Sequence, residues 1–492
     1  MIAQRVQDHL YQLLLLRGSM QRINLGEWQP DQPSISGSLT EATNIIPQLV
    51  GYSPLPTASQ YSNAASEDLH TAFTGIYGSS LVLFAGGLTK LFKFNDLTTN
   101  LDNVSKAGNY TSSTTWEFTQ YGNAIIAANN EDKLQVWYLG SSTAFADLAA
   151  TAPVAKFVTV VRDFVVAGSI DSGANPSKVQ WSDLNDETDW TSAPTSQADY
   201  QELSDGGNIT GLTGGEFGLI LMERGVARMT YTGSPYFFQI DTISRGLGCM
   251  ESGSVTQYGN ITYFLSDNGF YACDGQNLIP IGAEKVDKFF LSDANQSTLS
   301  QMSASVDPIR KLVLWEYRNN DEQNALLIYN WQVKRWTYGI TDADYLSTAA
   351  TPALTLEALD AFGTVDSITT SFDSRVWVGG KSILSGIRDN KVITFTGANS
   401  GASIATGDIE LSQNSVVTVI KPLSQDGSCN AQISSTRNLT GVTNYGAISY
   451  QNADGRCPVR SAGRFHRIRL LPAGTWTNII GMDIEAATQG NR

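Results

Sequence analysis

The chain has 492 residues, enough for two to four domains, with 41% hydrophobic but only 16% charged residues. Its 44 glycines and many small polar residues favour short strands joined by tight turns over helices. A formal net charge of −15 argues against a protein that grips nucleic acid by neutralising phosphates, and no apolar run approaches the ~18 residues of a membrane-spanning helix.

Residues 1–70 are expected to form an N-terminal helix followed by an extended arm or platform segment. The helix would present one apolar face to a neighbour, although Met20 could instead be the biological start. After Met20 the segment is polar and interrupted by Pro30 and Pro33, which suits an extended chain. The apolar face comprises Ile2, Val6, Leu10, Leu13 and Leu14.

Residues 71–400 repeat one unit, in which a turn leads into a short apolar strand and a second turn leads into a returning strand. The spacing of roughly 40–50 residues is that of propeller blades, whose small twisted sheets bury their faces by stacking around an axis. We therefore expect an all-β protein with a β-propeller of about six blades; five or seven blades, or two ordinary sandwiches, remain open. The expected strand pairs are 81–85 with 88–94, 124–128 with 133–138, 164–168 with 178–181, 217–222 with 226–231, 261–265 with 270–273 and 311–317 with 325–331, with one more unit near 374–375 and 391–395.

Two short segments, Ala283–Leu291 and Leu354–Asp360, are expected to be helical inserts. Residues 401–492 alternate apolar and polar side chains again and predict a C-terminal β-sandwich-like domain. Its expected strands are 416–420, 431–434, 446–450, 465–471 and 482–486.

Several segments in this order resemble the tail nozzle, or tail hub, family of short-tailed bacteriophages, which includes proteins like tail tubular protein B. The resemblance implies a hexameric ring below the tail adaptor, with a central channel for genome exit and no catalytic residues or cofactor. Its implied partners are further copies of the chain, the adaptor, tail fibre or tailspike proteins, the host cell surface, and double-stranded DNA that passes without specific contacts. The implied location is the distal end of the virion tail, after assembly in the host cytoplasm. The segments are Gly26–Asp31, Ala42–Pro47, Gly51–Pro56, Lys178–Asp183 with Asp189-Trp190, Tyr231–Phe238, Gly246–Cys249, Ser252–Val255, Gly463–Arg469, Ala473–Trp476 and Gly481–Asp483.

A subunit or adaptor interface is expected at two places. Segments that contain proline can reach a neighbour with a small loss of conformational entropy, because proline already restricts the unfolded chain. The basic stretch Arg456–Arg469 could contact an acidic neighbour or slow DNA, or it could simply form ordinary ion pairs on a half-exposed strand. The candidate interface residues are Trp28, Pro30, Asp31, Asn44, Pro47, Tyr52, Arg464, Arg467 and Arg469.

Motifs for catalysis are absent from the sequence. It has neither a G-x-S-x-G elbow nor a phosphate-binding G-x-x-x-x-G-K-[ST] loop, and its four cysteines form no C-x-x-C pair, although a Cys429–Cys457 disulfide stays open. His70, beside Glu67 and Asp68, is expected to be an exposed loop histidine. We therefore predict a non-enzymatic protein that holds no metal.

The residues of the chain leave two other functions open. The acidic group at 183–189 could belong to a propeller glycosidase, which needs two carboxylates flanking a sugar, although a solvated turn fits its crowding better. The tryptophans and tyrosines could stack on sugars in a receptor-binding or glycan-binding tail propeller.

Overall fold

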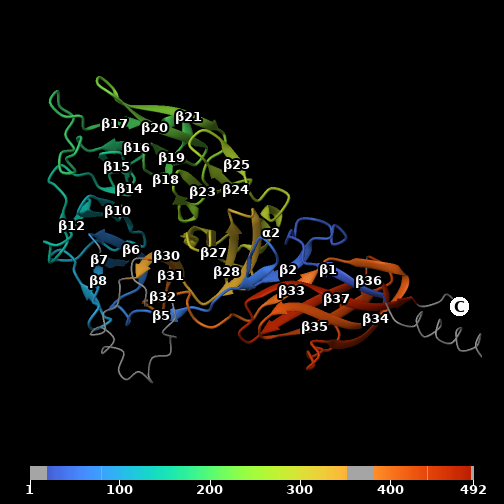
Figure 1. Cartoon of the computed structure of the whole chain (residues 1–492). Helices are drawn as coiled ribbons and strands as arrows, with labels where there is room; N and C mark the ends of the chain where they lie inside the picture. Colours follow the sequence, from blue (N-terminus) through green and yellow to red (C-terminus); the bar gives the residue numbers. More distant parts are fainter. Residues whose placement is uncertain (1–18, 79, 352–380, 440, 489–492) are drawn as a thin grey trace, which may run out of the picture.

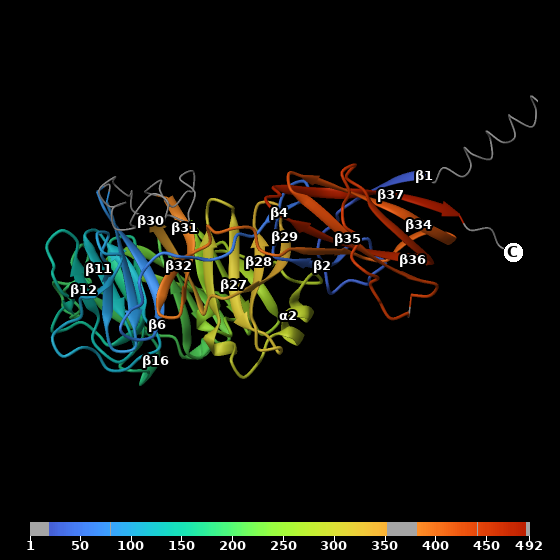
Figure 2. The same cartoon turned by 90° about the horizontal axis from the view of Figure 1, so that it is seen from below.

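The computed structural model describes residues 19–78, 80–351, 381–439 and 441–488. Figure 1 shows a ring of small sheets on one side and a second β-rich body on the other, where the C-terminal strands gather. Figure 2 shows the two bodies side by side along one long axis. The expected N-terminal helix, the helix at 354–360 and the turn at 374–375 lie outside the described residues.

Four blades are separate antiparallel sheets of four strands, each ordered as the chain runs. The first comprises β10 (Glu117–Tyr121), β11 (Ala124–Ala128), β12 (Gln135–Tyr138) and β13 (Ala146–Asp147). The second comprises β14 (Ala155–Val161), β15 (Phe164–Ile170), β16 (Asn175–Trp181) and β17 (Asp199–Glu202). The third comprises β18 (Ile209–Thr213), β19 (Gly218–Met222), β20 (Gly225–Gly233) and β21 (Phe237–Arg245). The fourth comprises β22 (Thr256–Tyr258), β23 (Ile261–Ser266), β24 (Gly269–Cys273) and β25 (Leu278–Pro280).

Two larger sheets complete the ring, so that six sheets of the described chain surround the axis, and this confirms the expected all-β propeller. The eight-stranded sheet contains two four-stranded units, joined by one parallel bridge between Phe73 and Thr348. Its strands are β6 (Leu69–Tyr77), β7 (Ser80–Gly87), β8 (Leu91–Phe94), β9 (Leu101–Asn103), β30 (Tyr345–Thr351), β31 (Lys381–Arg388), β32 (Lys391–Thr394) and β5 (Ser59–Gln60). The other sheet contributes β26 (Ser303–Asp307), β27 (Leu312–Arg318), β28 (Asn324–Asn330) and β29 (Arg335–Thr341).

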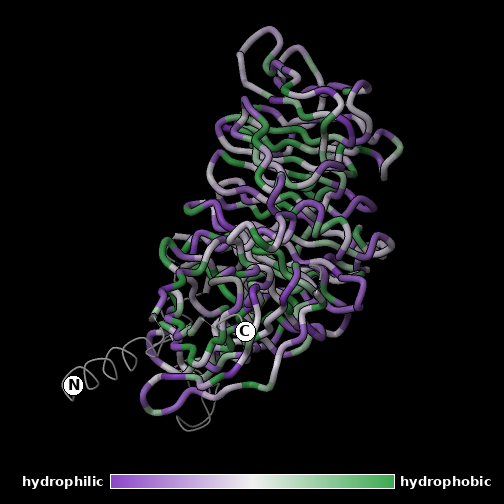
Figure 3. The backbone as a smooth tube through the Cα atoms, turned by 90° about the vertical axis from the view of Figure 1, so that its right-hand side faces the viewer, coloured by the Kyte–Doolittle hydropathy of each residue, from purple (hydrophilic) through white to green (hydrophobic). Residues whose placement is uncertain are grey.

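The expected strand pairs are the second and third strands of the blades. These middle strands read as continuous apolar runs, as in the fully buried β15 and β19, because a neighbouring blade covers each of their faces. Tight turns between the first and second strands of a blade use left-handed backbone, as at Gly122 with φ +54° and Gly259 with φ +60°. Figure 3 shows hydrophobic residues along the strands and hydrophilic residues in the connecting loops.

The C-terminal body consists of β33 (Ser403–Thr406), β34 (Ile409–Gln425), β35 (Ser428–Thr436), β36 (Cys457–Ala473) and β37 (Asn478–Thr488). Long β36 pairs with β33, β34 and β35, so these strands share one sheet. The structure confirms the expected β-rich domain and four of its strands. The fifth expected strand, at 446–450, is wrong: this segment makes only one isolated bridge, between Ala431 and Ser449.

The segment at 19–60 is an internal strap rather than a free arm. It comprises β1 (Ser19–Asn24), β2 (Leu39–Thr43), β3 (Ile45–Pro47), β4 (Tyr52–Pro54) and β5. Strands β1 and β4 pair with β37, and β2 lies between β29 of the propeller and β33 of the C-terminal body. Strand β5 then pairs with β32 and completes the eight-stranded sheet. The strap therefore joins the sheets of both bodies.

Helices are short and few in the described chain. Helix α2 spans Asp287–Asp293, slightly later than the expected 283–291. Single 3-10 turns occur at η1 (Ser204–Gly206), η2 (Ser252–Ser254) and η3 (Leu299–Gln301).

One apolar core extends from the propeller into the C-terminal body. It includes residues of β24, α2, β27, β29, the strap and strands β34–β37. Trp28 of the strap is 3% exposed and packs edge-on against Phe289 of α2, with ring centroids 5.1 Å apart, and beside Tyr338 of β29 at 6.3 Å. The two bodies are therefore held by shared burial rather than by a flexible linker.

Replacing Trp28 with alanine should lower the free energy of unfolding by about 3–5 kcal/mol, because a buried aromatic ring is lost and a cavity remains. Urea unfolding followed by circular dichroism measures this change. Tyr236→Ala, at a tip where the side chain is 81% exposed, should change stability by less than about 0.5 kcal/mol. Equal effects of the two variants would contradict the shared core.

Candidate functional site

Three of the predicted interface residues lie inside the chain's own core, so the expectation that they contact a neighbour is wrong. Trp28 and Tyr52 are 3% and 0% exposed, and Pro47 is also buried. The Tyr52 hydroxyl donates a hydrogen bond to the Gly26 carbonyl at 2.6 Å, and burial raises the pKa of Tyr52 well above its usual value. These side chains bind the strap to the two bodies.

Asp31 and Asn44 also act within the chain. The Asp31 carboxylate accepts hydrogen bonds from the backbone N–H groups of Lys288 and Phe289 at the start of α2, at 3.0 and 2.8 Å. Asn44 adopts left-handed backbone with φ +57°, and its amide oxygen accepts the Ile340 N–H while its amide nitrogen donates to the Gly401 carbonyl. Pro30 lies half-exposed directly before Asp31.

The three arginines lie on β36 and each pairs with a carboxylate of the same chain. Arg467 pairs with Asp408 at 2.9 Å, and Arg469 pairs with Glu41 of the strap at 2.8 Å. Arg464 pairs with Glu410 at 2.7 Å, where both side chains are more than 40% exposed. Arg467 and Arg469 therefore form ordinary ion pairs within the chain, which was one of the two possibilities that the sequence left open. Arg464 remains accessible to a partner.

A groove of about 1090 Å³ lies along the seam where the strap meets both bodies. It is bordered by the β3–β4 hairpin, the turns of the β26–β29 blade and the β36–β37 turn. Leu49 and Val50 at the hairpin tip are 79% and 63% exposed, and Trp476 lies in the wall. Sequence reasoning missed this groove because its walls come from four distant parts of the chain.

A smaller cavity of about 500 Å³ lies where β6, β27 and β30 approach one another. His70 lines it, and the expectation of an exposed loop histidine is wrong: the residue lies on β6, and both of its ring nitrogens are buried without a hydrogen-bond partner. Burial lowers the pKa of His70, and its ring stands edge-on to Tyr345 at 5.3 Å. A neutral imidazole with enclosed nitrogens is poorly placed for acid–base catalysis.

Glu316 at the floor of this cavity also escaped sequence reasoning. It is 4% exposed, and burial, with a smaller effect of Asp344, raises its pKa to about 8. The available signal was a lone acid inside the apolar run of Leu312–Arg318.

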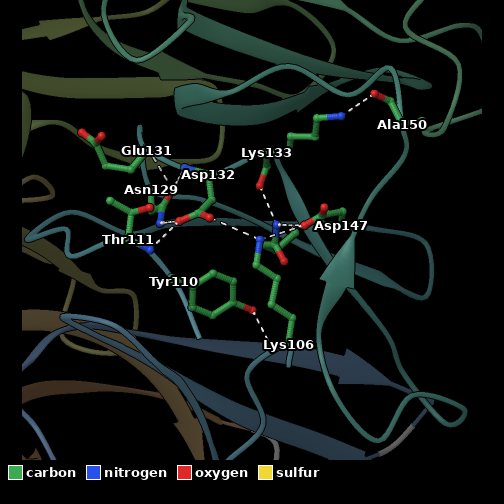
Figure 4. Close-up of polar contacts among 10 residues, drawn as sticks. Lys106, Tyr110, Thr111, Asn129, Glu131, Asp132, Lys133, Asp147 and Ala150 are labelled. Carbon is green, nitrogen blue, oxygen red and sulfur yellow. Dashed lines mark hydrogen bonds and ion pairs between the residues drawn. The ribbon is translucent and has the colours of Figure 1, made fainter. Parts of the chain in front are cut away.

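A network of polar side chains fastens two neighbouring blades (Figure 4). Lys106 Nζ lies 3.2 Å from Asp132 and 3.0 Å from Asp147, and its ammonium lies 5.2 Å from the centre of the Tyr110 ring. Asp132 also accepts hydrogen bonds from Thr111 N–H and Asn129. The charged groups here pair within the chain, so the network holds the two blades together.

The acidic group at 183–189 forms a turn that uses its own carboxylates. Asp183 accepts hydrogen bonds from the N–H groups of Leu184 and Gln197, and Asp186 accepts two from Thr188. These bonds favour the solvated-turn interpretation over a pair of carboxylates facing a sugar.

The described residues include four free cysteines and a second buried histidine. No group of three or more His, Cys, Asp or Glu side chains gathers there in a way that would hold a metal ion. All four cysteines are free and buried, and the Cys457 thiol lies 3.4 Å from the Cys429 carbonyl. His466 is enclosed between the hydroxyls of Ser415 and Ser435, each at 2.7 Å. Within the same ranges, no helix combines the length and apolar character needed to cross a membrane.

No protein-family model and no curated protein matches the chain. Among solved structures it is similar to the WD40 domain of Neurospora crassa Pan2, at 6% identity and TM-score 0.39 over 68% of this chain and 94% of that one. It is similar to a chain of a mitotic checkpoint complex at 10% identity and TM-score 0.38, over 70% and 93%. It is also similar to a putative 6-phosphogluconolactonase of Bacteroides fragilis at 14% identity and TM-score 0.39, over 56% and 85%.

Reversing the charge of Arg467 should destabilise the protein by about 2–3 kcal/mol, because the new carboxylate would face Asp408, whose side chain is only 10% exposed. Arg464→Glu makes the same change at an exposed pair and should cost less than about 0.5 kcal/mol. Urea unfolding of both variants provides the measurement. Equal losses would contradict the distinction between an internal and an accessible arginine.

Removing the charge of Lys106 should make stability less sensitive to acid. Partial burial alone would raise the pKa of Asp147, but hydrogen bonds from Gln135 and Lys106 hold it below its usual value. A lowered folded-state pKa gives stability that is present above about pH 4 and is lost as pH falls through the folded pKa.

Lys106→Met should therefore lower stability at neutral pH by about 1 kcal/mol and flatten its decline between about pH 4 and pH 2. The matched control is Lys311→Met, because Lys311 donates to Gln332 on the surface. Thermal melts across this pH range test the expectation, and an unchanged acid slope in Lys106→Met would refute it.

Proposed function

We propose that this chain is a structural subunit of the tail nozzle of a short-tailed bacteriophage, assembling as a homo-hexamer around a channel for genome exit. Its partners would be the tail adaptor and the tail fibre or tailspike proteins. The chain would act in the virion as a conduit and gate, without catalysis.

The observation that carries this proposal is the meeting of five of the family-like segments at one seam. Segments at 26–31 and 42–56 form the strap, and those at 473–476 and 481–483 surround or flank it. Gly481 pairs with Asn24 of the strap, and Ile479 pairs with Tyr52. Segments over 420 residues apart in sequence thus form one structural unit, as expected if they fix the angle between the two bodies in a rigid tube.

The net charge and the side-chain contacts of the chain support a role as a conduit for DNA. A net charge of −15 would repel passing DNA and keep its contacts weak. The acids at 183–189 hydrogen-bond within their own turn. Arg464, the most exposed of the three predicted arginines, offers a contact to an acidic neighbour.

Electron microscopy of the purified full-length chain, alone and mixed with the tail adaptor, tests the proposal. The expected result is a six-fold ring with a central lumen that joins the adaptor coaxially. Arg464→Glu should block this joining while leaving the fold intact, and Glu216→Gln, an exposed change elsewhere, should leave it unaffected. Monomers or trimers that ignore the adaptor but bind host glycans would favour a receptor-binding propeller instead.

A further inference from the structure

The polar cavity between the blades has no use in the proposed tail function. Its volume of about 500 Å³ falls within the range of small-molecule sites and far exceeds the space of a single water molecule. Its walls come from β6, β27, β28, β30 and the turn after β31. Because several blades form its walls, the propeller itself holds the cavity in shape.

The carboxyl group of Glu316 lines the cavity and has capacity for further hydrogen bonds. Glu316 is more than nine-tenths buried, and its side chain accepts a hydrogen bond from Ser303 Oγ at 3.0 Å. An ionised carboxylate has room for about four such bonds. Because its pKa is raised to about 8, Glu316 is mostly protonated at neutral pH.

The rim of the cavity is negatively charged. Three exposed carboxylates, those of Asp68, Asp344 and Asp389, line the cavity together with one guanidinium, that of Arg318. Negative charge lining a concave site attracts and concentrates cations. The titratable and charged groups around Glu316 are Arg318 on its own strand, Asp344 and Tyr345 at the start of β30, Asp68 and His70 at β6, and Asp389 after β31. The ion pair of Arg388 and Asp342 lies next to Asp344.

The spacing of these acids favours an organic cation over a metal ion. A divalent metal needs several oxygens converging at about 2.0–2.6 Å, and the described residues contain no group of three metal-binding side chains. An ammonium group instead has three rotatable N–H donors and donates them to carboxylates at hydrogen-bond distance.

We infer that this cavity binds a small organic cation with primary amines, one ammonium group meeting Glu316 at the floor and another meeting the carboxylates of the rim. Binding converts the Glu316 carboxylic acid to a carboxylate, which accepts from the ammonium, and the released proton goes to solvent. No covalent bond between ligand and protein forms. The affinity therefore rises with pH until Glu316 is ionised without the ligand.

Titration calorimetry of the full-length chain with 1,4-diaminobutane, at low salt, tests the inference. Binding should be about tenfold tighter at about pH 8 than at about pH 6.5, and about one proton should be released at the lower pH. The proton count follows from the heats in two buffers with different ionisation enthalpies.

Glu316→Gln keeps the shape of the protonated acid, and an unchanged melting temperature at neutral pH would verify its fold. This variant should lose proton release and at least about tenfold in affinity at about pH 8. The control Glu216→Gln removes an exposed carboxylate far from the cavity and should behave as the wild type.

Three results would overturn the inference. They are no binding of the diamine, equal binding by wild type and Glu316→Gln, and equal affinity for Mg²⁺ or Ca²⁺, which would reveal only general attraction of counter-ions.

Discussion

The burial of three aromatic rings, Trp315, Trp336 and Phe270, is the interaction on which the rest of the structure depends. All three are fully enclosed; the two indoles stack with centroids 5.6 Å apart, and Phe270 lies 4.7 Å from Trp315. Their indole N–H groups donate to the Ser254 and Ile281 carbonyls, so burial leaves neither donor unpaired. A single four-stranded blade cannot enclose such rings, which is why neighbouring blades, α2 and the strap close over them.

The strap connects the propeller and the C-terminal body across this core. Strand β2 pairs with the propeller on one side and the C-terminal body on the other, and the Asn44 side chain bonds to both. Domains joined only by a small interface usually move relative to one another. Here a shared sheet and a shared core oppose such motion, which would suit the proposed role as a rigid subunit around a channel.

The sequence predicts the propeller because the middle strands of its blades, such as β15 and β19, are apolar on both faces. The inner strand β10 escapes prediction because Glu117, Thr119 and Gln120 make it half-polar. Trp28 and Tyr52 stand out in the sequence, but a sequence pattern cannot say whether the surface that covers them belongs to the same chain. The same limit hides the cavity of Glu316 and His70, because 246 residues separate these two positions along the chain.

Hydrogen exchange of the full-length chain in increasing urea tests the central claim most directly, namely that the propeller and the C-terminal body form one cooperative unit. The account predicts that amides of β2, β29, β33 and β36 become exchangeable together, at the urea concentration where the whole chain unfolds. Exchange of the C-terminal strands at clearly lower urea, while the blades stay protected, would contradict it.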